Sequence, residues 1–353
     1  MAENGPREKV AEIVSSKLFS KFRWLQYGPI NQDFKCIHED EHKPVGKSQA
    51  HTHPVDIVFS YKDPYLNKTI FLNTDLKSYA ASSLGPSMIE SALISLAKTI
   101  ECASNSPEWR EKYSICVGND EVRGMLFVYN HDNNPSKSFY EYFYPPKPEG
   151  KGRRPRAVQI DKINIPKNKQ IHIIEPDVIA YMMAVTSDMT EMIAERTFPA
   201  KNYGFYYPQL TLHKVITSEK YKPATIELIS SPFMIIEHDA VFDYNDDGVK
   251  KMLHEQGYVV YYNRPGEEDN EFVYLLDTLA KCQILNGKNR IRIRLAYKNK
   301  NSHVRSNFAR AIEKYAHEWS YDNDMTEYLK SIELHVVPTV KEFYCTETLS
   351  WER

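Results

Sequence analysis

The sequence predicts an α/β protein: a mixed sheet flanked by helices, followed by a second α/β or α+β domain. Short apolar runs typical of strands alternate with segments whose apolar residues recur at helical spacing. The chain has 353 residues, more than one typical small domain. The alternation also changes rhythm near residue 222. We therefore expect a first domain over residues 1–221 and an accessory domain over residues 222–353.

The first domain is expected to run helix, three strands, helix, strand. "REKVAEIVSSKLFSKFRWL" carries a helical apolar stripe after Gly5 and Pro6, which suit a helix start. "DFKCIHE", "HPVDIVFSY" and "TIFLNTDLKSYA" predict the three strands. "PSMIESALISLAKTIECA" predicts an amphipathic helix, "YSICVG" and "RGMLFVYN" predict further strands, and "IHIIEPDVIAYMMAV" predicts a strand and a helix.

The second domain is expected to continue the alternation of strands and helices. Predicted strands are "ATIELISSPFMIIEH", "YVVYYN", "RIRIRLAYK" and "IELHVVPTV", and predicted helices are "DGVKKMLHEQ", "EFVYLLDTLAKCQIL" and "SNFARAIEKYAHEW". "DYNDDG" resembles the start of a calcium-binding loop, but the twelfth position is His254 instead of glutamate. We interpret it as a turn whose aspartate caps the next helix.

Composition excludes several classes of protein. The formal net charge of −2 argues against a surface that coats nucleic acid, so polyanion contacts must be local. The five cysteines are widely spaced and form no CxxC pair, which argues against a disulfide framework and a zinc ribbon. The first residues contain no apolar signal core, and no run reaches membrane-spanning length. We therefore expect a reducing, cytoplasmic compartment.

Charged residues interrupt two of the predicted strands. Asp56 lies in "HPVDIVFSY", and Asp75 and Lys77 lie in "TIFLNTDLKSYA". Because side chains alternate along a strand, Asp75 and Lys77 are expected to share one face while Leu76 faces the other. If Asp56 lies beside Asp75, two carboxylates repel unless a cation lies between them. This pattern favours Mg²⁺-assisted phosphodiester hydrolysis.

Residues 5–130 resemble the PD-(D/E)xK nuclease superfamily, also described as restriction-endonuclease-like. Pro54, Asp56, Asp75 and Lys77 match its signature one by one, although Val55 splits the "PD" pair. The resemblance implies that Asp56 and Asp75 bind Mg²⁺, or Mn²⁺, with the Leu76 carbonyl as a further ligand, and that Lys77 assists the attacking water. It also implies a glutamate on the N-terminal helix.

Two glutamates could fill that position, Glu8 and Glu12, and Glu8 fits the family spacing better. The alternative to a nuclease site is a salt bridge between Asp56 and Lys77, with Asp75 capping a turn. A chain of that kind would be a catalytically silent subunit that binds nucleic acid or a partner.

Basic residues supply two candidate surfaces. The Pro-rich loop near residues 130–156 contains Lys151, Arg153, Arg154 and Arg156, which are candidates for gripping a phosphate backbone. Arg290, Arg292 and Arg294 alternate along one predicted strand, and we interpret them as an exposed face paired with acidic neighbours instead of a phosphate-binding strip.

A histidine-rich segment precedes Asp56. His38, His42, His51 and His53 fall within sixteen residues, which suits either a zinc site or a polar hairpin tip beside the active site. We favour the hairpin tip because no cysteine stands in register with the histidines.

These observations predict a metal-dependent endonuclease acting on nucleic acid, DNA more than RNA. By resemblance, its role is antiviral defence in a prokaryote. Residues 222–353 are expected to place the substrate, form a homo-oligomer or dock a partner protein.

Overall fold

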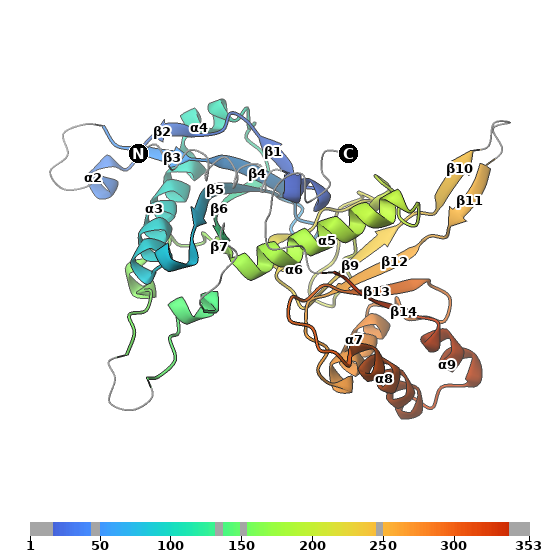
Figure 1. The fold of residues 1–353 in the computed structure, drawn as a ribbon. Coiled ribbons are helices and arrows are strands. Elements are labelled where there is room, and N and C mark those ends of the chain that lie inside the picture. Colours follow the sequence, from blue (N-terminus) through green and yellow to red (C-terminus); the bar gives the residue numbers. More distant parts are fainter. Residues whose placement is uncertain (1–16, 44–49, 131–136, 149–153, 245–249, 339–353) are drawn as a thin grey trace. The chain divides into compact units, whose positions relative to one another are not determined.

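The computed structural model describes residues 17–43, 50–130, 137–148, 154–244 and 250–338 (Figure 1). These residues form two compact units. The first contains described residues 17–63 and 67–179, and the second contains residues 64–66 and 180–338.

The first unit is built on a five-stranded mixed sheet with the order β1-β4-β5-β6-β7. Strands β1, β4 and β5 pair antiparallel, whereas β5, β6 and β7 run parallel. The central β5 and β6 are the longest strands, and their apolar residues are buried because both faces of the sheet are covered. The bounds are β1 Leu25–Tyr27, β4 Ile57–Lys62, β5 Thr69–Tyr79, β6 Asp120–Asn130 and β7 Ile171–Ile174.

Helix α3, Pro86–Asn105, packs on β6 and β5 (Figure 1). It follows Gly85, has proline at its first position and buries Ile89, Leu93 and Leu96 on one stripe. Gly124 on β6 permits this close packing, because a Cβ atom there would lie 2.9 Å from Leu96 Cγ. A β-carbon at that position would therefore force the Leu96 side chain to shift.

A group of short strands and helices packs near the C-terminal end of α3. Strands β2, Gln32–Lys35, and β3, Thr52–Val55, form an antiparallel pair, and the short helix α2, Glu39–His42, lies between them in the chain. Helix α4, Pro107–Lys112, buries Trp109 and is capped by Ser106, whose hydroxyl accepts from the Trp109 N–H at 3.2 Å. The 3₁₀ turns of this unit are η1 Ala81–Ser83, η2 Phe139–Tyr142 and η3 Ile160–Lys162.

The second unit has its own five-stranded mixed sheet, with the order β14-β13-β12-β9-β8. Strands β12, β13 and β14 are parallel, whereas β8 and β9 join antiparallel. The bounds are β8 Tyr203–Phe205, β9 Phe233–His238, β12 Gly257–Tyr262, β13 Ile291–Leu295 and β14 Glu333–Val336, with a separate hairpin of β10 Val241–Tyr244 and β11 Lys250–His254.

Helices α7, α8 and α9 lie together beside β13 and β14 (Figure 1). Their apolar faces join the sheet in one core that includes Phe272, Leu276, Phe308 and Leu329. The helices of this unit are α6 Ile226–Ile229, α7 Asp269–Lys281, α8 Val304–Glu318 and α9 Asn323–Lys330, and α5, Pro176–Ala194, enters it from the first unit.

The division between the units differs from the predicted boundary at residue 222. The compact units divide between Ile179 and Ala180, inside α5. The reason is that the segment after α5 supplies β8, which pairs with β9 of the second sheet. The alternation of strands and helices that begins near residue 222 therefore lies within the second unit and does not mark its start.

Three local predictions are wrong. "DGVKKMLHEQ" was expected to be helical, but Lys250–His254 is strand β11, paired with β10 in a hairpin. The interpretation of "DYNDDG" as a helix cap is wrong too, because the described residues that follow it, Lys250–His254, are a strand; residues 245–249 lie outside the described residues. "YSICVG" contains no strand, because the chain turns there between α4 and β6, with Ser114 at φ 53°.

The three arginines just before and within β13 do not form the exposed face expected from the sequence. Arg290 is exposed and pairs with Glu333 at 3.3 Å, but Arg292 is buried and donates to His238 Nε2 at 3.1 Å. Arg294 forms a nearly buried two-point ion pair with Asp188, which also accepts from the Tyr261 hydroxyl at 2.8 Å. Two of the three arginines therefore hold the second unit together.

We expect Arg294→Ala to lower the free energy of unfolding by about 3–5 kcal/mol, because it leaves the Asp188 carboxylate buried without its cation. Arg290→Ala should cost less than about 1 kcal/mol, because its ion pair is solvent-exposed. Urea unfolding of both variants measures the difference. Equal losses would show that the buried pair stabilises the unit no more than the surface pair does.

In the part of the chain that the structure describes, no helix has the length and apolar character needed to cross a bilayer.

Candidate active site

Strand β5 presents a row of polar side chains to one cavity. Asn73, Asp75, Lys77 and Tyr79 all line it, and they are two residues apart. The residue between Asp75 and Lys77 is Leu76, whose side chain is buried and does not line the cavity. The alternation expected from the sequence therefore holds in the structure.

Asp56 reaches the same cavity from a bend between β3 and β4, and not from within a strand as expected. Its N–H donates to the Thr74 carbonyl at 3.3 Å, and the N–H of Leu76 donates to Asp56 Oδ2 at 2.6 Å. Backbone contacts with β5 therefore hold Asp56 beside Asp75, and the bend turns its carboxylate across the strand.

The cavity has a volume of about 370 Å³ and lies between β5, the end of β3 and helix α3. The remaining lining residues are Pro54 on β3, Thr74 on β5 and Met88, Ser91, Ala92, Ser95, Leu96 and Thr99 on α3. The small and hydroxylated side chains of α3 leave open space opposite the carboxylates.

The electrostatics of the cavity centre on two carboxylates and one ammonium group. Lys77 Nζ forms a short ion pair with Asp75 Oδ1. Burial, followed by the charge of Asp75, raises the pKa of Asp56 to about 6, although the Leu76 N–H opposes this. Burial alone would lower the pKa of Lys77, but Asp75 and Asp56 outweigh it and raise this pKa. Lys77 is therefore a cation at neutral pH.

This arrangement differs from the salt-bridge alternative considered for the sequence. Lys77 pairs with Asp75 and not with Asp56, and Asp75 stands in the middle of a strand, where it caps no turn. The observed pair nevertheless leaves the Asp56 carboxylate with an unfavourable neighbour, because the electrostatic effect of Asp75 exceeds that of Lys77.

The donor set fits a divalent cation. Carboxylate oxygens are the ligands that Mg²⁺ prefers, and it keeps water on its remaining positions, for which the cavity has room. A bound cation would also offset the two effects that disfavour charge on Asp56, its burial and the proximity of Asp75. The structure shows the Leu76 N–H on Asp56, and the Leu76 carbonyl as a ligand stays a prediction.

The pKa of Asp56 predicts how the metal-free protein responds to pH. An acid whose folded-state pKa is raised from 3.8 to about 6 contributes stability below pH 3.8, and that contribution is lost as the pH rises through about 6. Asp56→Asn removes this loss, so at pH 7 with chelator we expect it to be about 1–3 kcal/mol more stable than the wild type, and equal to it near pH 4. Melting curves from pH 4 to 7 test this. A constant difference across the range would place the raised pKa elsewhere.

Asn73 is a cavity residue that sequence reasoning did not single out. Its Oδ1 accepts from the indole N–H of buried Trp109 at 3.1 Å, which fixes the amide. Its buried Nδ2 has no hydrogen-bond partner among the described residues. The cavity thus holds a free, oriented donor beside the carboxylates. The signal was present in the two-residue spacing of Asn73 from Asp75.

The remaining predicted site residues are only partly described. Glu8, Glu12, Lys151 and Arg153 lie outside the described residues. Arg154 is exposed. Arg156 contacts the Glu90 carboxylate of α3 at 3.5 Å, and the same carboxylate accepts from the Gln159 N–H at 3.1 Å. The chain just after the basic loop is therefore tied to the helix that lines the cavity.

Comparison with known proteins gives one family. Residues 1–178 match the model described as "GAPS4 protein PD-(D/E)XK nuclease domain", which covers the described first unit up to Val178 and half of the chain. No curated protein and no solved structure matches the chain. The superfamily indicated by Pro54, Asp56, Asp75 and Lys77 and the mixed α/β fold are thereby confirmed.

Proposed function

Since the chain belongs to the family of GAPS4 protein PD-(D/E)XK nuclease domains and is a nuclease of that fold, we propose that it hydrolyses phosphodiester bonds of DNA with a divalent cation, Mg²⁺ or Mn²⁺. The observation that carries this proposal is the convergence of Asp56, Asp75 and Lys77 on one cavity. Nucleases of this superfamily generally use divalent metals.

Asp56 and Asp75 would hold the cation, and when bound it would polarise the phosphate and lower the pKa of the attacking water. Lys77 Nζ would donate to the attacking water or to a phosphate oxygen and would stabilise negative charge in the transition state. The Leu76 N–H orients Asp56. Asn73 Nδ2, which has no hydrogen-bond partner among the described residues, is proposed as a donor to a phosphate oxygen or to water. Glu8 is proposed as a third acidic residue.

DNA is proposed over RNA as the substrate, with Lys151, Arg153, Arg154 and Arg156 contacting the phosphate backbone. The net charge of −2 supports a local basic contact over a general one. Residues 222–353 are proposed to bind a second copy of the chain or a partner protein, in a role in antiviral defence.

The test is cleavage by the purified full-length chain. Supercoiled plasmid, linear duplex and single-stranded RNA are incubated with Mg²⁺, with Mn²⁺ and with EDTA. We expect metal-dependent cleavage of DNA that EDTA abolishes. Calorimetry with Mg²⁺ and Mn²⁺ on the wild type and on an Asp56→Asn, Asp75→Asn double variant measures metal binding separately.

A protein that binds DNA but neither cleaves it nor binds the metals would be the catalytically silent subunit. RNA cleavage without DNA cleavage would overturn the substrate and leave the chemistry intact.

A further inference from the structure

A second cluster of potential metal ligands lies outside the cavity. Cys36, His42, His53 and Cys102 each place one ligand atom so that all four lie within 4.8 Å of one another. All four side chains are buried, between 0% and 6% exposed. They come from separate segments: the end of β2, helix α2, strand β3 and helix α3. The fold therefore gathers two sulfur and two nitrogen donors at one buried point.

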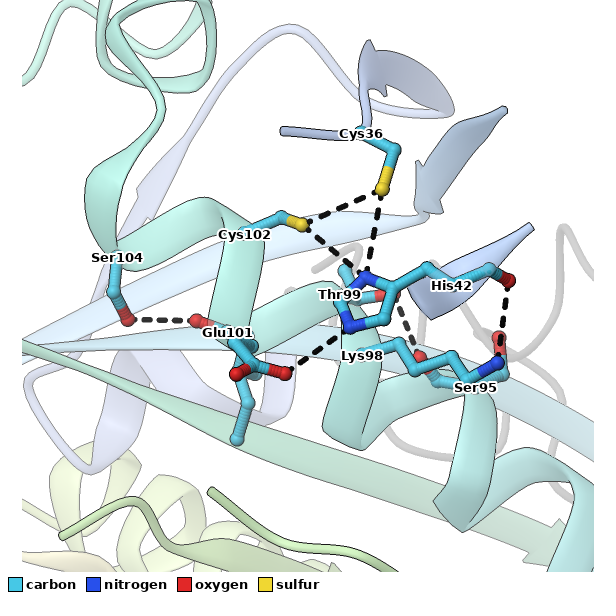
Figure 2. A network of polar contacts seen from close by, with 9 residues as sticks. Cys36, His42, Ser95, Lys98, Thr99, Glu101, Cys102 and Ser104 are labelled. Atoms are coloured by element: carbon cyan, nitrogen blue, oxygen red, sulfur yellow. Dashed lines mark hydrogen bonds and ion pairs between the residues drawn. The ribbon is translucent and has the colours of Figure 1, made fainter. Parts of the chain in front are cut away.

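The distances within the cluster suit tetrahedral zinc. Cys36 Sγ and Cys102 Sγ are 3.7 Å apart, and His42 Nδ1 lies 3.5 Å from the first and 3.4 Å from the second (Figure 2). Zn–S bonds of about 2.3 Å and Zn–N bonds of about 2.0–2.1 Å, at tetrahedral angles, set sulfur atoms about 3.8 Å apart and sulfur about 3.5 Å from nitrogen. The three donors thus stand at the corners that one zinc ion requires.

The remaining polar contacts orient the ligands. His42 turns Nδ1 toward the sulfurs, and its Nε2 lies 3.1 Å from Glu101 Oε2, the carboxylate–histidine pairing found behind zinc ligands (Figure 2). Lys98 Nζ donates to the His42 carbonyl at 3.2 Å and fixes α2 on α3. The backbone N–H groups of Ile37 and His38 hydrogen-bond to the Cys102 sulfur, although burial raises the pKa of this thiol to about 11.

His53 provides the fourth potential ligand of the cluster, and its own surroundings point independently to a bound metal. It is 2% exposed, and its Nε2 has no hydrogen-bond partner among the residues that the structure describes. A buried imidazole nitrogen without a partner costs free energy unless something binds it. A metal ion in the cluster would remove that cost.

We propose that Cys36, His42, His53 and Cys102 bind a structural Zn²⁺ ion. Two thiolates and two imidazoles that fill all four positions form a closed site, which holds metal for stability and leaves no position for water or substrate. Binding releases the two thiol protons and gives a complex without net charge, which suits a buried location. The ion would link the β2–β3 pair and α2 to α3. It would thereby stabilise β3 and α3, the two elements that line the cavity opposite β5.

This proposal corrects the prediction of a polar hairpin tip. That prediction assumed that no cysteine stood in register with the histidines. Cys36 and Cys102 are the missing partners, and Cys102 is 49 residues after His53, on a helix. His38 and His51, the other two histidines of the segment, are not part of the ligand set.

The test is the zinc content of the full-length chain, purified without a metal-affinity tag, by mass spectrometry of the elements. We expect about one zinc ion per chain. Cys36→Ser and Cys102→Ser should lose it, whereas Cys116→Ser, at an exposed cysteine of the same unit, should keep it. Asp75→Ala should also keep it, which separates this site from the nuclease cavity and from the outcome of any cleavage assay.

Two further measurements keep the proposal testable if the cysteine variants do not fold. Wild-type protein stripped of metal under reducing conditions and loaded with Co²⁺ should show the intense visible bands of tetrahedral thiolate coordination. Glu101→Gln should fold but bind zinc about 10–100-fold more weakly in competition with a chelating indicator, because it removes the charge behind His42.

A chain that contains no zinc and gives no such Co²⁺ spectrum would overturn the proposal. So would an intact mass two hydrogens lighter than the reduced chain, with a peptide linking Cys36 to Cys102, because that would make the cluster a disulfide. Zinc that persists in both cysteine variants would equally place the ion elsewhere.

Discussion

Asp75→Ala is expected to reduce DNA cleavage by more than about 10³-fold, since the cation supplies several kcal/mol of transition-state stabilisation and each 1.4 kcal/mol is tenfold. Asp56→Asn should have a similar effect, because it removes charge from the other proposed ligand while its amide oxygen still accepts from the Leu76 N–H. Initial rates on plasmid DNA at several Mg²⁺ concentrations measure the loss. Extra Mg²⁺ should restore little activity.

The matched control is Asp161→Ala. Asp161 lies on η3 of the same unit, is exposed and does not line the cavity. It should cleave as the wild type does, and all three variants should give wild-type circular dichroism. Wild-type rates for both Asp75→Ala and Asp56→Asn would contradict the site.

Lys77→Ala is expected to lower the turnover rate by about 10²–10³-fold, the scale of one lost contact to transition-state charge. The metal should still bind, because an ammonium group is not a ligand. The affinity of the variant for the metal should even rise, since Lys77 pairs with Asp75 and competes with a cation for that carboxylate. Single-turnover cleavage and calorimetry with Mn²⁺ measure the two effects separately.

Lys162→Ala, on the exposed η3, serves as the matched control for loss of a positive charge. Loss of metal binding together with activity in Lys77→Ala would mean that the lysine holds the carboxylates in place. Unchanged turnover would remove Lys77 from the mechanism.

Local patterns in the sequence predicted the part of the site that lies on one strand. Asp75 and Lys77 share a face because a strand alternates, and α3 forms where apolar residues recur at helical spacing. Asp56 was placed beside them, but the bend that carries it was not predicted. That bend depends on hydrogen bonds to Thr74 and Leu76, which are about twenty residues away in the chain.

Long-range contacts explain the other failures. Lys250–His254 has a sequence compatible with a helix, and only its pairing with β10 makes it a strand. Arg294 looks like a surface residue until Asp188, more than one hundred residues earlier, provides its partner. The sequence around Cys102 gives no sign that Cys36, His42 and His53 lie beside it. In each case the deciding neighbour is distant in sequence, and local propensity carries no information about it.

Strand β3 places two neighbouring residues in different sites. His53 faces the buried cluster of cysteines and histidines, whereas Pro54 lines the cavity that contains Asp56 and Asp75. Because successive side chains of a strand point in opposite directions, inserting or deleting one residue here would exchange the two faces. Such a register shift would move the His53 imidazole into the cavity and Pro54 into the cluster. A relative or a redesigned variant that preserves either site must therefore keep the length of strand β3, Thr52–Val55.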